Sequence, residues 1–124
     1  MFVLVDTSVW VQHFRKGIPE LPAMLVAKEV ASHPVVVGEL AVGGLPNRPK
    51  MLAVLRGLPQ VSDRPADEVL DLIEQHRLYT IGLSWGDAQL LAAAIHSRTP
   101  LWTLDAALHA QAQAFGVAWT QPTP

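Results

Sequence analysis

Two short apolar runs constrain the fold most strongly, because each ends at an aspartate that opens a helical pattern. Residues 2–5 read FVLV and precede Asp6, and residues 100–104 read PLWTL and precede Asp105. Both runs have the length and apolar character of buried strands. Strands separated by helices pair in parallel, because the chain crosses back over the sheet between them. The sequence therefore predicts an α/β protein built around a parallel sheet.

The remaining chain alternates helical patterns with short apolar segments. Helices are predicted over residues 8–15, 20–31, 34–43, 48–57, 65–77, 86–97 and 106–115. Short strands are predicted near residues 31–33, at 60–62 and at 117–119. The valines after Pro34 would also suit a strand, but a proline in this position favours the start of a helix. We expect one domain over residues 1–124, with a loose tail at 121–124.

Composition excludes several kinds of site and location. The chain has no cysteine, so a disulfide framework and a thiolate metal site are both impossible. Its five histidines show none of the HxxxH or HxH spacings typical of zinc sites. No segment approaches the ~20 apolar residues of a membrane span, and Asp6 interrupts any signal-peptide core. We therefore expect a cytoplasmic protein without a membrane segment.

Four acidic residues stand at the margins of apolar elements, namely Asp6, Glu39, Asp87 and Asp105. In a parallel sheet the carboxyl ends of the strands meet at one edge, where such folds bind ligands. Carboxylates gathered there repel one another unless a cation lies among them. Oxygen ligands without histidine or cysteine suit Mg²⁺ or Mn²⁺. The pattern is therefore compatible with a metal site.

Each acid also has an interpretation that needs no ligand. Helix caps are available at Asp6 or Thr7, at a capping box formed by Ser84 and Asp87, and at Asp105. Glu39 could point outward from a helix. Capping does not exclude metal binding, because a side chain at the start of a helix can do either. Both interpretations stay open at this point.

Resemblance to a known family rests on three stretches, which read VLVDTSVWV, VVVGELAVGG and SWGDAQLLAAAIHSRTPLWTLD. They resemble the PIN domain and, more closely, the VapC-type toxin ribonucleases, over nearly the whole chain. The resemblance implies a three-layer α/β/α sandwich around a parallel sheet. It also implies RNA cleavage, a homodimer, and a cognate VapB-type antitoxin that blocks the site.

The resemblance also implies roles for individual residues. The implied metal-binding acids are Asp6, Glu39, Asp87 and Asp105, and the implied supporting hydroxyls are Thr7 and Thr103. Relatives often carry basic residues around the last acid, whereas this chain has Leu104, Ala106 and Ala107 there. Candidate RNA contacts are therefore the other basic residues, namely Arg15, Lys16, Arg48, Lys50, Arg56 and Arg98.

Two other kinds of α/β protein are disfavoured by the sequence. A haloacid-dehalogenase-type phosphatase needs a second Asp where Ser8 stands, and a receiver domain needs a lysine later than Lys50. A PIN-fold RNA-binding module with a degenerate site remains an alternative, although all four acids are present. A nuclease that works without an antitoxin is another. The net charge of −2 is not typical of an RNA-binding protein, but setting aside four metal-bound acids leaves seven acidic against nine basic residues.

Aromatic residues are predicted mainly to build the core. Trp10 and Phe14 share one helix face, which favours core packing, with an antitoxin-binding stripe as the alternative. Trp85, Trp102 and Trp119 are predicted to pack in the core or on the sheet rather than to stack on RNA. The acidic helix at 65–77 is predicted to present a solvated face, and His96 is assigned a structural role.

Overall fold

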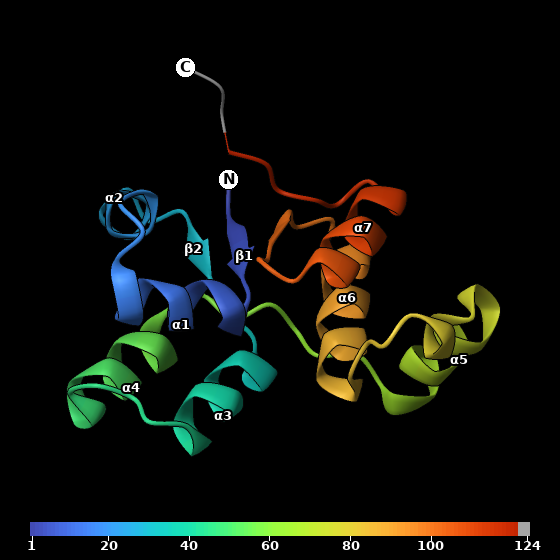
Figure 1. Cartoon of the computed structure of the whole chain (residues 1–124), viewed down its shortest axis with the longest axis horizontal. Helices are drawn as coiled ribbons and strands as arrows, with labels where there is room; N and C mark the ends of the chain where they lie inside the picture. The colour runs from blue at the N-terminus through green and yellow to red at the C-terminus, as the bar shows by residue number, and fades with distance from the viewer. Residues whose placement is uncertain (122–124) are drawn as a thin grey trace.

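A parallel sheet of three strands lies at the centre of the computed structural model, which describes residues 1–121 (Figure 1). The middle strand is β1 (Val3–Val5), with β2 (Val30–Ala31) on one side and β3 (Leu101–Trp102) on the other. Both neighbours run parallel to β1. The predicted α/β class and the parallel sheet are confirmed.

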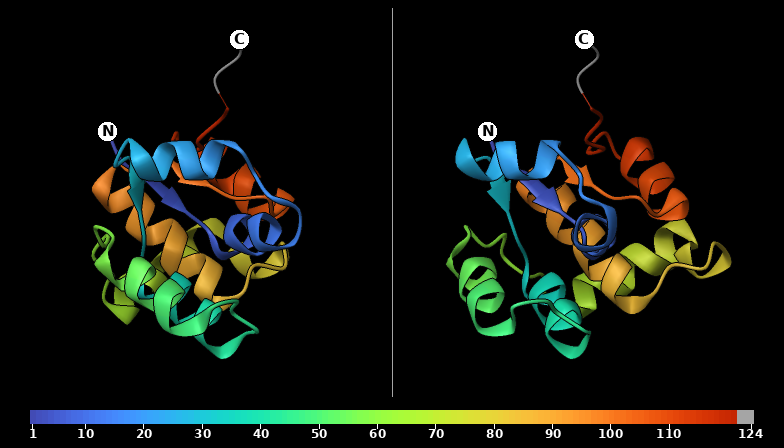
Figure 2. Two further views of the ribbon diagram at one scale, coloured as in Figure 1. Left: turned by 90° about the vertical axis from the view of Figure 1, so that its left-hand side faces the viewer. Right: turned by 60° about the vertical axis from the view of Figure 1, so that its left-hand side comes forward.

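Helices cover both sides of this sheet, so the three-layer α/β/α sandwich is also confirmed. Here α1 (Thr7–Lys16) and α2 (Glu20–Val26) lie on one side of the strands, and α6 (Trp85–Ser97) lies on the other (Figures 1 and 2). The other helices are α3 (Pro34–Val42), α4 (Arg48–Gly57), α5 (Ala66–His76), the 3-10 helix η1 (Leu78–Thr80) and α7 (Ala106–Ala114). Among residues 1–121, no helix combines the length and the apolar character needed to span a membrane.

The core is centred on β1, where Leu4 and Val5 are completely buried. Strands covered on both faces bury nearly every side chain, which is why this run is apolar throughout. Trp10 is only 1% exposed and belongs to the same apolar cluster, so the core interpretation of Trp10 is confirmed. Trp102 is buried and packs on Trp119, with 4.4 Å between ring centroids.

Trp85 does not pack as the sequence predicted. Its side chain is 45% exposed, because α6 begins at this residue and the first buried residue of the helix is Ala88. The expectation of core packing for Trp85 is therefore wrong. The acidic face of α5 agrees with prediction, since Val69 is its only buried residue among those described.

Helix α2 is shorter than its apolar pattern predicted, which extended to residue 31. It ends at Val26, and Lys28 then adopts a left-handed backbone with φ 59°. The Glu29 carbonyl accepts a hydrogen bond from the Val3 N–H at 2.7 Å. Pairing with β1 thus takes residues 30 and 31 into the sheet.

The outer strands are also shorter than predicted. The segments at 60–62 and 117–119 each contribute one parallel bridge, Ser32 with Gln60 and Leu101 with Ala118. Edge segments of this kind gain hydrogen bonds on one side only, so pairing stops early. The predicted loose tail lies outside the described residues except for residue 121.

A buried histidine caps the start of α3. His33 is 0% exposed, its Nδ1 accepts a hydrogen bond from the Val35 N–H at 3.0 Å, and its Nε2 lies 3.1 Å from Asp63 Oδ1. Because Nδ1 is an acceptor, the ring proton of the neutral form lies on Nε2 and points to Asp63. A neutral imidazole therefore caps the helix that carries Glu39.

We expect His33 to make the protein less stable as the pH falls below about 6.5. Burial lowers the pKa of His33, although the Asp63 carboxylate acts in the opposite direction. Between the lowered folded pKa and the ordinary unfolded value, the unfolded chain binds more protons. The free energy of unfolding should therefore rise with pH in this window, by at most about 1.36 kcal/mol per pH unit from this group.

Urea unfolding at a series of pH values measures this dependence. His33→Asn is the matched variant, because asparagine offers a capping oxygen and does not titrate in this range. Its stability should vary less with pH between the two pKa values. Identical pH dependence in both proteins would show that His33 makes no contribution.

Candidate active site

Asp6 is the most deeply buried of the four acids, with 5% of its surface exposed. It occupies the N-cap position of α1, yet its side chain makes no capping hydrogen bond. Its Oδ2 instead accepts hydrogen bonds from the hydroxyls of Ser8 and Thr103, each at 2.7 Å. A buried ionised carboxylate costs several kcal/mol unless polar partners or a cation compensate for the lost water. The capping alternative is therefore wrong for Asp6, and the two hydroxyls hold its carboxylate at the end of β1.

The same hydroxyls connect the first acid to the last. Ser8 Oγ accepts a hydrogen bond from the Leu104 N–H, and Thr103 Oγ1 accepts one from the Asp105 N–H, both at 3.0 Å. The ends of β1 and β3 are thus joined through hydroxyl groups. The resemblance pointed to Thr103 but not to Ser8. The available signal was the DTS tripeptide, in which a serine follows Asp6 in the first turn of a helix.

Glu39 reaches the same region from α3. Its Oε1 accepts a hydrogen bond from Thr7 Oγ1 at 2.7 Å, which ties α3 to the start of α1. A Cβ added to Gly86 would lie 3.3 Å from Glu39 Oε2 and 3.1 Å from Val35 Cγ1. The missing side chain of Gly86 therefore lets the start of α6, which carries Asp87, approach α3 closely. Sequence reasoning did not identify this glycine.

Asp87 and Asp105 both cap helices, as the alternative interpretation proposed. Asp87 Oδ2 accepts a hydrogen bond from the Ser84 N–H, and Ser84 Oγ accepts one from the Asp87 N–H, both at 3.1 Å. Asp105 Oδ1 accepts a hydrogen bond from the Leu108 N–H at 3.0 Å. In each carboxylate the other oxygen makes none of the hydrogen bonds found among residues 1–121. Capping therefore leaves one oxygen of each acid available to a ligand.

Three of the acids interact electrostatically. Burial raises the pKa of Asp87 above its ordinary value, hydrogen bonds from Ser84 oppose this shift, and the negative charges of Asp6 and Asp105 add to it. Like charges have this effect only when they share a region of the protein. The carboxyl ends of β1 and β3 and the start of α6 thus form one negatively charged edge.

The donor set at this edge fits a hard cation in its chemistry. Carboxylate oxygens without nitrogen or sulfur donors are the ligands of Mg²⁺ and Mn²⁺. Within residues 1–121, however, no three acidic or histidine side chains lie close enough together to hold a metal ion as they stand. The structure brings the acids to one edge, and their role as direct ligands is a proposal.

A hollow of about 190 Å³ opens beside Glu39 and Thr7, between α1 and α3. Its wall is largely apolar and includes Val11 and the half-buried Phe14. Arg15 also lines this hollow. It is one of the candidate RNA-contacting residues, and the hollow places it near Glu39.

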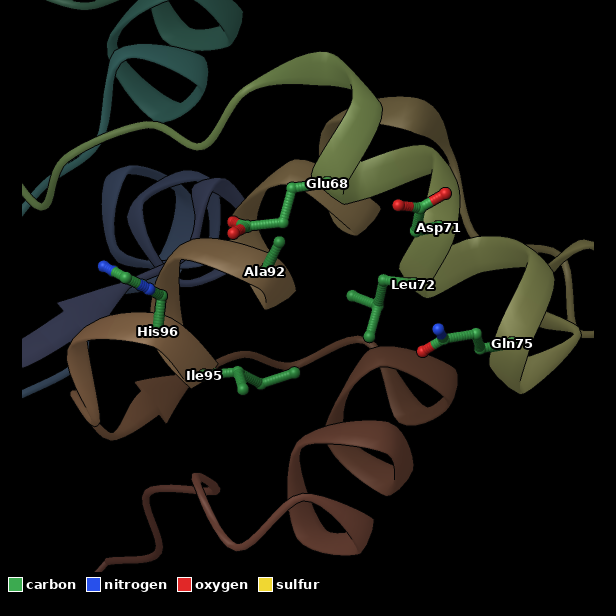
Figure 3. A pocket seen from close by; sticks show the side chains of 7 residues that line it. All are labelled: Glu68, Asp71, Leu72, Gln75, Ala92, Ile95 and His96. Carbon is green, nitrogen blue, oxygen red and sulfur yellow. The ribbon is translucent and has the colours of Figure 1, made fainter.

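Another hollow, of about 340 Å³, lies between α5 and α6 and is lined by none of the four acids (Figure 3). Glu68 and Asp71 line it from α5, and Ala92, Ile95 and His96 line it from α6. Arg64 pairs with Glu68, with 3.1 Å between Nη2 and Oε1. This hollow is therefore separate from the candidate active site and carries acidic groups of its own.

Comparison with known proteins identifies close relatives. The chain is 40% identical over 117 residues to a protein named Ribonuclease VapC32 from Mycobacterium tuberculosis (strain CDC 1551 / Oshkosh), and the match covers 94% of each chain. The protein of the same name from strain ATCC 25618 / H37Rv matches to the same extent. No family model matches the chain.

Proposed function

The chain belongs to the VapC-type PIN-domain ribonucleases, and we propose that it is a metal-dependent endoribonuclease acting as the toxin of a VapBC-type pair. The observation that carries this proposal is the 40% identity, over 94% of the chain, to a protein named as a ribonuclease. The proposed reaction is hydrolysis of RNA phosphodiester bonds. The proposed place of action is the cytoplasm.

The proposed metal ligands are the carboxylates of Asp6, Glu39, Asp87 and Asp105. When bound, Mg²⁺ or Mn²⁺ would lower the pKa of a coordinated water and neutralise charge that develops on the phosphate. Ser8 and Thr103 fix Asp6 by hydrogen bonds to one oxygen, and Thr7 fixes Glu39 in the same way. Groups held in this manner lose little freedom when they bind a ligand. The carboxylates thus hold the ion, and none of them acts as a nucleophile.

We propose an apolar segment of a VapB-type antitoxin as the partner at the hollow between α1 and α3. Trp10 is buried and offers no such surface, whereas Val11 and Phe14 line the hollow beside Glu39. A segment seated there would cover the acidic edge. The homodimer is also part of the proposal, and it rests on family membership alone.

Purified protein freed of its partner should cleave single-stranded RNA with Mg²⁺ or Mn²⁺ and lose this activity in excess EDTA. Gel analysis of the products measures cleavage, and calorimetric titration with Mn²⁺ measures metal binding. Undiminished activity in EDTA would contradict the metal proposal. RNA binding with neither cleavage nor Mn²⁺ binding would identify an RNA-binding module with a degenerate site.

The growth rate of a host cell that expresses the chain distinguishes a toxin with an antitoxin from a nuclease without a partner. Expression of the chain alone should slow growth, and co-expression of an adjacent antitoxin gene should restore it. Growth that remains slow in the presence of the neighbouring gene product would favour an unpaired nuclease.

A further inference from the structure

Two exposed aromatic side chains form part of the wall of a hollow next to the candidate active site. The hollow has a volume of about 210 Å³, lies between η1 and the start of α6, and includes Tyr79, Leu83, Ser84 and Trp85 in its lining. We call it the aromatic hollow. Tyr79 is 61% exposed and Trp85 is 45% exposed. None of the ring contacts found among residues 1–121 joins these two residues, so neither ring covers the other.

The aromatic hollow adjoins the residues that fix Asp87. Ser84 lines the hollow, and its Oγ accepts the hydrogen bond from the Asp87 N–H. Trp85 is the first residue of α6, and Asp87 follows it two positions later. Residues at this spacing lie on opposite sides of a helix. Asp87 and the aromatic hollow therefore lie on opposite sides of the first turn of α6. A strand of RNA that passes the acids at the start of α6 has the hollow within this same turn.

The lining of the aromatic hollow suits a nucleobase. Among residues 1–121, no acidic side chain lines it, whereas Glu68 and Asp71 line the hollow between α5 and α6 and would repel phosphates (Figure 3). Every base has an apolar face that stacks on aromatic side chains, which makes such contacts tolerant of sequence. Exposed tryptophan beside a site for a negatively charged strand therefore favours a base over an apolar peptide.

We infer that Trp85 and Tyr79 form a stacking site for one base of the RNA, beside the phosphate held at the acidic edge. This inference rests on the proposed ribonuclease function and adds a residue pair that positions the substrate. Stacking acts equally on the bound substrate and the transition state. Its loss should therefore raise KM and leave kcat unchanged.

The test compares Trp85→Ala and Trp85→Phe in the full chain, with Phe2→Ala as the matched control. Phe2 is 47% exposed, but it precedes β1 and so stands at the opposite end of that strand from Asp6. Fluorescence anisotropy with labelled oligoadenylate in EDTA measures binding without cleavage. Trp85→Ala should weaken binding about 5- to 150-fold, the range for one stacked base. Trp85→Phe should retain most of the affinity, and Phe2→Ala should match the original protein.

A strand of the same length that lacks its bases shows whether stacking is the cause. The original protein and Trp85→Ala should bind this strand equally, because only phosphate contacts remain. Unchanged affinity of Trp85→Ala for oligoadenylate would overturn the inference, and so would an equal loss with the base-free strand or in Trp85→Phe. Thermal melts verify that each variant is folded.

The same proteins separate this inference from its rivals. If Trp85→Ala dissociates a dimer without changing affinity for oligoadenylate, the surface belongs to a second copy of the chain and the inference is overturned. If the original protein binds oligoadenylate but cleaves no RNA, the proposed function fails while the binding comparison still decides the stacking site. If oligoadenylate binds neither in EDTA nor with Mn²⁺, the inference is overturned, and the cleavage assay then decides the proposed function by itself.

Discussion

Asp87→Asn is expected to abolish RNA cleavage while leaving the metal-free protein as stable as the original or more stable. Asparagine keeps an acceptor oxygen for the Ser84 N–H, so the cap of α6 survives the change. The substitution removes a charge that is unfavourable where it stands, because burial and the charges of Asp6 and Asp105 raise the pKa of Asp87. Cleavage is lost because a proposed ligand of the ion has become neutral.

Mg²⁺ distinguishes a metal site from a set of helix caps. At a hundred times its dissociation constant, Mg²⁺ should stabilise the original protein by about 2.7 kcal/mol and the Asn variants less. Asp105→Asn is the companion variant, since it keeps an acceptor for the Leu108 N–H. Thermal melts of the three proteins, with EDTA and with Mg²⁺, measure the difference. Equal shifts in all three, with cleavage retained, would mean that these acids only cap helices.

The main strands, and the positions of three acids at strand ends or at a helix start, could be predicted because their signals are local. Asp6 and Asp105 directly follow apolar runs. Asp87 belongs to a capping box whose pattern, Ser84 with an acid three residues later, is visible in the sequence. Elements that depend on distant partners were predicted less well. The segment at 60–62, for example, keeps one bridge, and its partner Ser32 lies in another part of the chain.

Residues that act through long-range contacts could not be predicted from periodicity. Ser8 lies 95 positions from Thr103 in sequence, and His33 lies 30 positions from Asp63, yet each pair is in contact. The exposure of Trp85 is a similar case, because a tryptophan at the start of a helix looks the same in sequence whether another element covers it or not.

Ser8→Ala and Thr103→Val are each expected to slow cleavage about 10- to 100-fold, as loss of a group that orients a metal ligand does. Both hydroxyls donate to the same oxygen of Asp6 and lie 3.3 Å from each other. Each change also leaves a backbone N–H without its acceptor, at Leu104 or at Asp105. Either loss loosens the same carboxylate. The double variant should therefore cleave RNA faster than expected from multiplying the two single reductions in rate.

Thr7→Val provides the matched comparison for the double-mutant cycle of Ser8→Ala and Thr103→Val. The Thr7 hydroxyl bonds to Glu39 and not to Asp6. Its effect on cleavage should multiply with that of Ser8→Ala, because the two hydroxyls orient different carboxylates. Cleavage rates with Mg²⁺ measure both double-mutant cycles. Removal of one of these hydrogen bonds costs about 1–3 kcal/mol, so thermal melts in EDTA show whether each variant still folds. If Ser8→Ala and Thr103→Val multiply as fully as Ser8→Ala and Thr7→Val, the two hydroxyls do not act through Asp6, and its carboxylate is held by the fold of β1 alone.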